Sequence, residues 1–218
     1  MGKALADEVT YLPKSILWAF NQKIDLFRRV IQINSARQLS VIGSVGSSTT
    51  AAFLANLHEV CFGSISRAVT PLEHISQQTN QAANVALAFI SAESKNKDIL
   101  AAANHALASQ GSNFALTLTF DNPLGNICSN SGLATVLAYD MPWIKDGYLA
   151  TNSLIAMMII MARAYRTEID DLKLQSSLDA QWITQRHQQL RKKIFTQKLF
   201  SIEYSNCAVR TGRQNCGN

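Results

Sequence analysis

The chain has 218 residues, of which 47% are hydrophobic, so it is long enough to bury one good-sized core. Charged residues make up only 16%, which is low for a monomer with a fully solvated surface, and we expect a partner to cover part of it. The net charge of +5 is concentrated in residues 185–198, which contain five basic residues and no acid. A solvated helix face explains this segment better than a nucleic-acid partner, because no known nucleic-acid-binding motif accompanies the charges.

Membranes, metals and cofactors are not expected. The most apolar stretch, residues 154–162, is too short to span a bilayer, and no signal peptide opens the chain, so we predict a cytoplasmic protein. Cys61 and Cys128 lie in apolar surroundings and are predicted to be buried thiols. Cys207 and Cys216 lie in a polar tail and are too few for a zinc site, and a disulfide between them is neither supported nor excluded.

The first half of the chain alternates between helical and strand patterns. Apolar residues at helical spacing over 13–37 predict a helix with Pro13 near its first turn. The elements expected next are a strand over 39–43, a helix over 48–63 that ends at Gly63, a short strand over 67–72 stopped by Pro71, and a strand over 85–91.

The second half continues the alternation. It contains an Ala-rich helix over 97–109, strands over 114–120 and 134–140 with a loop between them, and an apolar helix over 149–165.

The strands are apolar along their whole length, which is typical of a parallel sheet covered on both faces. The predicted fold class is therefore α/β, a doubly wound three-layer sandwich with about five parallel strands. We expect three parts: an N-terminal helical segment (1–38), the α/β domain (39–165) and a basic helical tail (166–218) that ends in disorder.

Ligands of such sheets bind at the carboxyl ends of the strands. After the strand over 39–43, glycines and hydroxyl-bearing residues lead into a helix, an arrangement that can hold an anion. The loop lacks the lysine of a Walker motif and the glycine pattern of a dinucleotide fingerprint, so alone it is equally consistent with an empty serine-rich turn. The loop over 91–98 repeats the arrangement, and the two together are more specific than either alone.

Five segments in this order carry a resemblance that covers roughly residues 40–165. They are VIGSVGSSTT (41–50), LHE (57–59), TPLEH (70–74), SAESKN (91–96) and KDGYLATNSL (145–154). The order resembles the sugar isomerase (SIS) domains, and in particular the first SIS domain of a bacterial double-SIS subgroup. The resemblance implies binding of a phosphosugar, a carbohydrate derivative, with sugar phosphate as the partner and no cofactor.

Carried over by position, the resemblance implies a set of ligand-binding residues in three loops. They are Ser44, Gly46, Ser47 and Ser48 in the first loop, Ser91, Glu93, Ser94 and Asn96 in the second, and Leu149 and Thr151 before the last helix.

The sequence departs from the family pattern at the positions that matter most for phosphate. Val45 and Ser94 stand where the family has glycine, and Glu93 and Asn96 replace a serine and a threonine. Two unit charges ~4 Å apart repel by about 4 kcal/mol at an effective dielectric constant of ~20, and a phosphate dianion doubles this. Tight phosphate binding therefore requires Glu93 to be protonated, turned away, or offset by Lys95 and Lys97.

Isomerisation of an aldose to a ketose would need a carboxylate or histidine base. The catalytic candidates are Glu73, Glu59 and His74, and the wider set adds His58, Lys145 and Asp146. Structural roles compete with each: Glu59 as a helix-face or interface acid, Glu73 as a loop anchor or dimer contact, and His58 as a packed histidine.

Three functional hypotheses remain from the sequence. The first is a phosphosugar-binding SIS module without catalysis, and the second is a sugar-phosphate isomerase or amino-sugar-phosphate deaminase. The third is a degenerate structural or regulatory module. The resemblance places the catalytic base largely in the other SIS domain, so either two copies pair or a second half is missing. We expect a homodimer, or pairing with another SIS domain.

Overall fold

The computed structural model describes residues 5–76, 84–106, 112–132, 134–143, 146 and 150–166. The predictions for residues 167–218, including Cys207 and Cys216, lie outside the described residues, as do Lys145 and Leu149.

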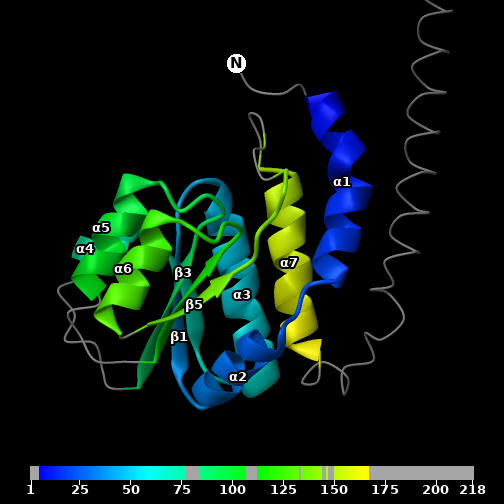
Figure 1. Cartoon of the computed structure of the whole chain (residues 1–218). Coiled ribbons are helices and arrows are strands. Elements are labelled where there is room, and N and C mark those ends of the chain that lie inside the picture. Colours follow the sequence, from blue (N-terminus) through cyan, green and yellow to red (C-terminus); the bar gives the residue numbers. More distant parts are fainter. Residues whose placement is uncertain are drawn as a thin grey trace, which may run out of the picture. The chain divides into compact units, whose positions relative to one another are not determined.

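A five-stranded parallel sheet forms the centre of the fold, as predicted (Figure 1). Its strands are β1 (Gln38–Gly43), β2 (Ser66–Val69), β3 (Val85–Ile90), β4 (Asn113–Thr117) and β5 (Ala134–Ala138). Their order in the sheet is β2-β1-β3-β4-β5, so the chain moves outward from β1 in one direction and then returns to the other side. The register pairs Gly43 with Ile90, which brings the carboxyl ends of β1 and β3 together at the point where the strand order reverses.

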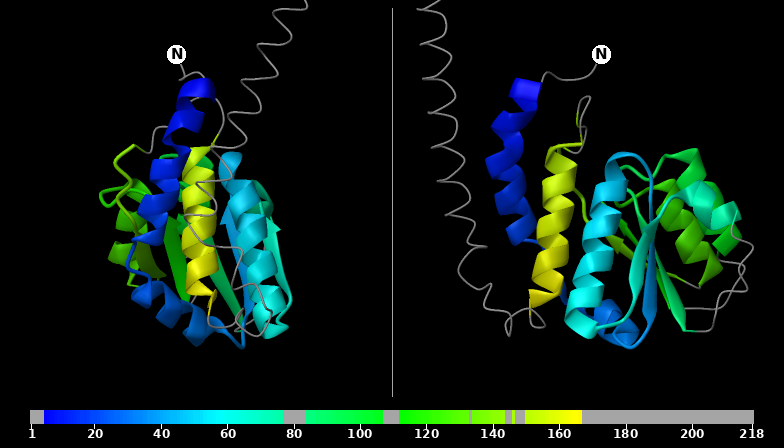
Figure 2. Two further views of the ribbon diagram at one scale, coloured as in Figure 1. Left: turned by 90° about the vertical axis from the view of Figure 1, so that its right-hand side faces the viewer. Right: turned by 180° about the vertical axis from the view of Figure 1, so that it is seen from behind.

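Helices cover both faces of the sheet (Figure 2). One face carries α4 (Pro71–Ser76), α5 (Lys97–Ala106) and α6 (Pro123–Ser131), and the other carries α3 (Gly46–Phe62) and α7 (Asn152–Ala164). The short helix α2 (Asp25–Asn34) lies near the amino ends of the strands, and α1 (Leu5–Phe20) packs on the outer side of α7. The chain is thus doubly wound.

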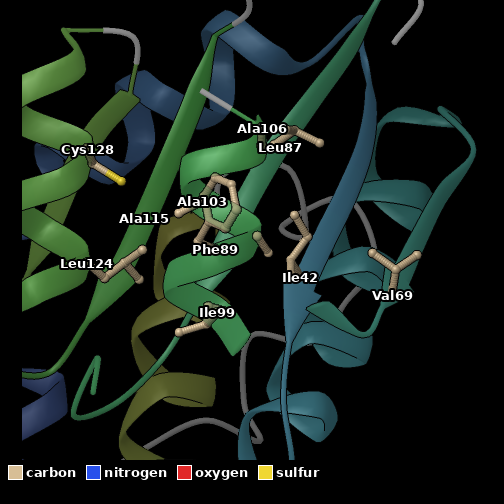
Figure 3. Packing of buried hydrophobic residues seen from close by; sticks show 11 residues of the cluster. Ile42, Val69, Leu87, Phe89, Ile99, Ala103, Ala106, Ala115, Leu124 and Cys128 are labelled. Atoms are coloured by element: carbon tan, nitrogen blue, oxygen red, sulfur yellow. The ribbon is translucent and has the colours of Figure 1, made fainter. Parts of the chain in front are cut away.

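The strands are apolar throughout because each has a packed layer on both sides. On one side, Phe89 and Ile42 of the sheet pack with Ile99 of α5 and Cys128 of α6 in a cluster of buried residues (Figure 3). On the other side, Phe27 of α2 packs against Phe114 of β4, with the ring centroids 6.0 Å apart.

The predicted single helix over 13–37 is wrong, because the structure has two helices there. Helix α1 begins earlier, at Leu5, contains Pro13 in its interior, and ends at Phe20. The guanidinium Nη1 of Arg163 on α7 donates to the carbonyl oxygens of Ala19 and Gln22, at 2.7 and 3.0 Å. These bonds satisfy carbonyls at the end of α1 that a longer helix would bond internally. The apolar spacing continues through the break because both helices bury one side.

The predicted loop over 121–132 is also wrong, because it contains α6. Its start signals are present in the sequence: Asn122 is the N-cap and accepts a hydrogen bond from the Gly125 N–H at 2.7 Å, and Pro123 occupies the first turn. Gly132 ends the helix with a left-handed conformation. Pro71 likewise begins α4, after β2 has ended at Val69.

The two described cysteines differ from each other. Cys128 is buried as predicted, and burial raises the pKa of its thiol to about 11. Cys61 is only partly buried, contrary to the prediction, because it lies near the end of α3. None of the helices in the described part of the chain combines the length and apolar character needed to cross a bilayer.

His58 joins α3 to two other parts of the fold. Its Nε2 lies 3.1 Å from the Arg37 carbonyl oxygen, which can only accept, so Nε2 carries the proton and Nδ1 accepts from the Tyr165 hydroxyl at 2.8 Å. The imidazole is 1% exposed, and burial lowers its pKa below 6.5. His58 is therefore a packed neutral histidine, the structural role that the sequence favours.

We expect the protein to lose stability as the pH falls from 7 to 5. Burial lowers the pKa values of both His58 and His74, so below about 6.5 the unfolded chain binds more protons than the folded chain. The midpoint of thermal unfolding should fall over this range. The His58→Phe variant should be less stable at pH 7 but show a shallower pH dependence, and an unchanged slope would contradict the assignment.

Candidate functional site

A pocket of about 450 Å³ opens at the carboxyl ends of β1 and β3. Its walls come from the loop after β1, the loop after β3 and the segment that begins α7. The lining residues are Ser44, Val45, Gly46, Ser47, Thr50, Ser91, Ala92, Glu93, Ser94, Lys95, Asn96, Asp146, Ala150, Ser153, Leu154 and Met157. The two loops selected from the sequence therefore face one cavity, at the switch point where such sheets bind ligands.

The first loop is a tight turn that contains an unusual valine. The Ser47 N–H donates to the Ser44 carbonyl at 3.0 Å, and Val45 adopts φ 48° and ψ −117° between them. These are the angles of the first central residue of a type II′ turn, a position dominated by glycine. A β-branched residue at positive φ is strained. Gly46 is required next to it, because a Cβ there would lie 2.8 Å from the Cβ of Ala150.

The second loop repeats this feature at Ser94, which has φ 58°. Its N–H donates to the Ser91 Oγ at 3.0 Å, and its own hydroxyl donates to the Ser91 carbonyl at 3.1 Å. Within the described residues, Val45 and Ser94 are the non-glycine positions with positive φ, and they are the two positions where the sequence lacks a glycine of the SIS pattern. Both loops therefore keep the backbone shape that glycine would provide.

The remaining side chains of the second loop are charged or form a helix cap. The Asn96 Oδ1 accepts from the N–H groups of Asp98 and Ile99, at 2.8 and 3.2 Å, so Asn96 caps α5. The Glu93 carboxylate lies 4.0 Å from the Lys95 ammonium, and their side chains are 47% and 75% exposed. This pair offsets part of the negative charge that Glu93 brings to the pocket, although exposed pairs of this kind are weak.

Asp146 is the second acid of the pocket and is bonded to the start of α7. Its carboxylate accepts from the N–H groups of Thr151, Asn152 and Ser153, at 3.0 to 3.1 Å, and from the Ser153 hydroxyl at 2.6 Å. Negative charge is favourable at a helix N-terminus, where these N–H groups have no partner within the helix. Asp146 therefore occupies the place at α7 that an anionic ligand could otherwise take.

Most of the predicted ligand-binding residues line the pocket. Those that do are Ser44, Gly46, Ser47, Ser91, Glu93, Ser94 and Asn96. Ser48 is exposed and is not part of the described lining. Its hydroxyl donates to the Val45 carbonyl. Thr151 also lies outside the lining, because its hydroxyl donates to the Glu8 carboxylate at 2.7 Å. Leu149 falls outside the described residues.

The three catalytic candidates lie away from the described lining of the pocket. Glu73 forms a capping box at α4, in which it exchanges hydrogen bonds with Thr70 at 3.2 and 3.4 Å. His74 is buried, with its ring centroid 5.9 Å from that of His105. Glu59 is exposed near the far end of α3, about 20 Å along the helix axis from Gly46.

The third wall comes from the predicted segment before the last helix, but other residues than Leu149 and Thr151 are in the described lining. Ala150, Ser153, Leu154 and Met157 line this side of the cavity, and all but Ser153 are apolar. Their spacing of three, four and seven residues was the available signal, because it places all four on one helical face.

Within the described ranges, no three His, Cys, Asp or Glu side chains come close enough together to hold a metal ion.

No protein-family model matches the sequence, and no curated protein matches it. Solved structures do match the fold. Tagatose-6-phosphate ketose/aldose isomerase from Escherichia coli is 16% identical, with a TM-score of 0.61, and the match covers 90% of this chain and 55% of that one. The Vibrio vulnificus NanR protein complexed with ManNAc-6P is 14% identical, with a TM-score of 0.57 and coverage of 86% and 70%.

A third match is the C-terminal domain of glucosamine-fructose-6-phosphate aminotransferase from Francisella tularensis. It is 11% identical, with a TM-score of 0.61, and the match covers 86% of this chain and 52% of that one. At these identities the likeness concerns the fold. The chain has the fold of SIS-domain proteins, which phosphosugar isomerases and sugar-phosphate-binding regulators share.

We expect Val45→Gly to stabilise the protein. Sparsely populated backbone angles cost roughly 1–3 kcal/mol, and glycine loses about 0.5–1 kcal/mol to backbone entropy. Val45 is 87% exposed, so little packing is lost, and the free energy of unfolding in urea should rise by about 1 kcal/mol. The matched variant Ser94→Gly also loses the buried hydrogen bond from the Ser94 hydroxyl, so its free energy of unfolding should rise by less. A less stable Val45→Gly protein would show that the turn is not strained.

Proposed function

We propose that the chain binds a sugar phosphate in the pocket between the β1 and β3 loops. The observation that carries the proposal is the position of the pocket, where two hydroxyl-rich loops meet at the switch point of a parallel sheet. The volume of about 450 Å³ lies within the range of small-molecule sites. The apolar side formed by Leu154 and Met157 can pack against the carbon face of a sugar, while Ser44, Ser47 and Ser91 offer hydroxyls to its polar edge.

The N-terminus of α3 is the part of the pocket best suited to the phosphate group. Three helices begin at the pocket, and side chains already satisfy the first N–H groups of two of them, through Asn96 at α5 and Asp146 at α7. At α3 the N-cap residue Val45 makes no side-chain cap hydrogen bond, and the N–H groups of Ser47 and Ser48 donate to the backbone carbonyls of Ser44 and Val45, at 3.0 and 3.1 Å, so no side chain takes the place of an anion there. The partial positive charge of this helix end favours an anion.

The placement of the acids supports binding without catalysis by this chain alone. Glu59 and Glu73 lie away from the described lining, and Asp146 is bonded to α7. Among the described residues that line the pocket, Glu93 is thus the remaining carboxylate that could act as a base. Pairing of two copies stays a prediction, because it rests on composition and on the family resemblance.

Titration calorimetry tests the proposal directly. The panel is tagatose 6-phosphate, ManNAc-6P and fructose 6-phosphate, with unphosphorylated tagatose and inorganic phosphate as controls. We expect saturable binding of at least one sugar phosphate and much weaker binding of both controls. The proposal would be contradicted if none of the sugar phosphates bound, or if they bound no more tightly than the two controls.

Glu93→Ser should tighten binding of the same sugar phosphate. The substitution removes a carboxylate that repels the phosphate, and because Glu93 is half exposed and near Lys95, the gain should be about 1 kcal/mol, or roughly fivefold in Kd.

The matched control is Glu59→Ser, which changes the net charge by the same amount near the far end of α3 and should leave Kd unchanged. Unchanged or weaker binding by Glu93→Ser, measured by calorimetry, would show that the Glu93 carboxylate does not oppose the ligand.

A further inference from the structure

Helix α1 lies alongside α7 and away from the sheet (Figures 1 and 2). It contributes no residue to the described lining of the pocket. Its contacts with α7 are nevertheless polar and buried near the start of α7, which is the end that forms a pocket wall. This distribution is unusual, because helices that pack only for stability mostly bury apolar side chains.

Two residues of α1, Glu8 and Ser15, make polar contacts near the start of α7. Glu8, which is 2% exposed, accepts a hydrogen bond from the Thr151 hydroxyl at 2.7 Å, and its carbonyl accepts from the Asn152 Nδ2 at 3.1 Å. Ser15, which is fully buried, donates to the Asn152 Oδ1 at 2.7 Å and accepts from the Trp143 Nε1 at 2.8 Å. The network therefore connects α1 to Trp143 and Thr151, which lie between β5 and α7, and to Asn152, the first residue of α7.

The same segment has a second side that faces the ligand pocket. Ala150 and Ser153 line the pocket, and Thr151 and Asn152 between them bond to α1. The Asp146 carboxylate holds the N–H groups of residues 151–153 from the pocket side. Thr151 and Asn152 are thus hydrogen-bonded both to α1 and to Asp146.

We propose that Glu8 and Ser15 are positioning residues that hold the α7 wall of the ligand pocket in place, so that docking of α1 and ligand binding are coupled. The inference rests on the proposed function for its ligand, but its structural part does not. A carboxylate this deeply buried is costly unless it is well bonded, so its presence points to an interaction with a specific task. Coupling is reciprocal: a ligand that contacts Ser153 tightens α1, and loss of the α1 contacts weakens the ligand.

The first experiment needs no ligand. Amide hydrogen exchange of the Asn152 and Ser153 N–H groups is measured by NMR in the full chain. We expect exchange to be at least tenfold faster in Glu8→Ala and in Ser15→Ala than in the wild type. Glu8→Gln keeps an acceptor oxygen for Thr151 and should restore slow exchange. Equal exchange rates in the wild type and both alanine variants would overturn the positioning role, whatever happens to binding.

Two controls separate local positioning from general loosening of α1. Leu17→Ala alters a 46% exposed residue of α1 and should leave exchange at 152 and 153 unchanged. Arg163→Met removes the contact at the other end of α1 and should lower the unfolding midpoint without accelerating exchange at these two amides. If Arg163→Met accelerates exchange as much as Glu8→Ala does, the specific role of Glu8 is overturned.

The second experiment measures Kd for the sugar phosphate that the wild type binds. We expect binding to be at least fivefold weaker in Glu8→Ala and close to the wild type in Glu8→Gln and Leu17→Ala. Faster exchange with an unchanged Kd would overturn the coupling. A wild type that binds none of the sugar phosphates would refute the proposed function instead, and the exchange rates would still decide the positioning role.

Discussion

The parallel pairing of β1 with β3 is the constraint on which the site depends. These strands are not consecutive in the chain, and their pairing reverses the strand order of the sheet. No helix can cover the gap above this reversal, because the connections leave β1 and β3 towards opposite faces. The loops after Gly43 and Ile90 therefore flank an open space, and the start of α7 closes its third side. The core supports this geometry, since Ile42 of β1 and Leu87 and Phe89 of β3 pack in one cluster with side chains of α5 and α6 (Figure 3).

The pocket places two acids in different electrostatic surroundings. Asp146 accepts four hydrogen bonds from the start of α7 and is held as a fixed part of the wall. Glu93 is partly exposed and has Lys95 as a distant partner at 4.0 Å. Asp146 occupies the anion position at the N-terminus of α7. Glu93 is less constrained, and its charge repels an anion in the pocket. Under the proposed function, the balance between Glu93 and the N-terminus of α3 sets how strongly the phosphate group binds.

Two loop positions keep a backbone conformation typical of glycine although neither residue is glycine. Val45 and Ser94 keep positive φ angles where the family pattern has glycine, and each is held differently. Ser94 is stabilised by two hydrogen bonds with Ser91, while Val45 is exposed and held by the turn around it. Surrounding structure therefore imposes these angles, as is common where a loop approaches a ligand. The α1 network adds a further constraint at Thr151 and Asn152, from a helix that does not touch the described lining of the pocket.

The sequence by itself determined the fold class, the five strands and the two loops of the site, because continuous apolar runs and glycine-serine turns are local signals. It also contained the capping signals of α6 around Asn122 and Gly132, although these were interpreted as a loop. Only the tertiary structure decided the break between α1 and α2, which residues around the start of α7 line the pocket, and the turning of Thr151 towards Glu8. It likewise separated Glu59, Glu73 and His74 from the described lining of the pocket. These features depend on contacts between residues far apart in the chain, such as the 143 positions between Glu8 and Thr151, and periodicity carries no information about which distant side chains meet.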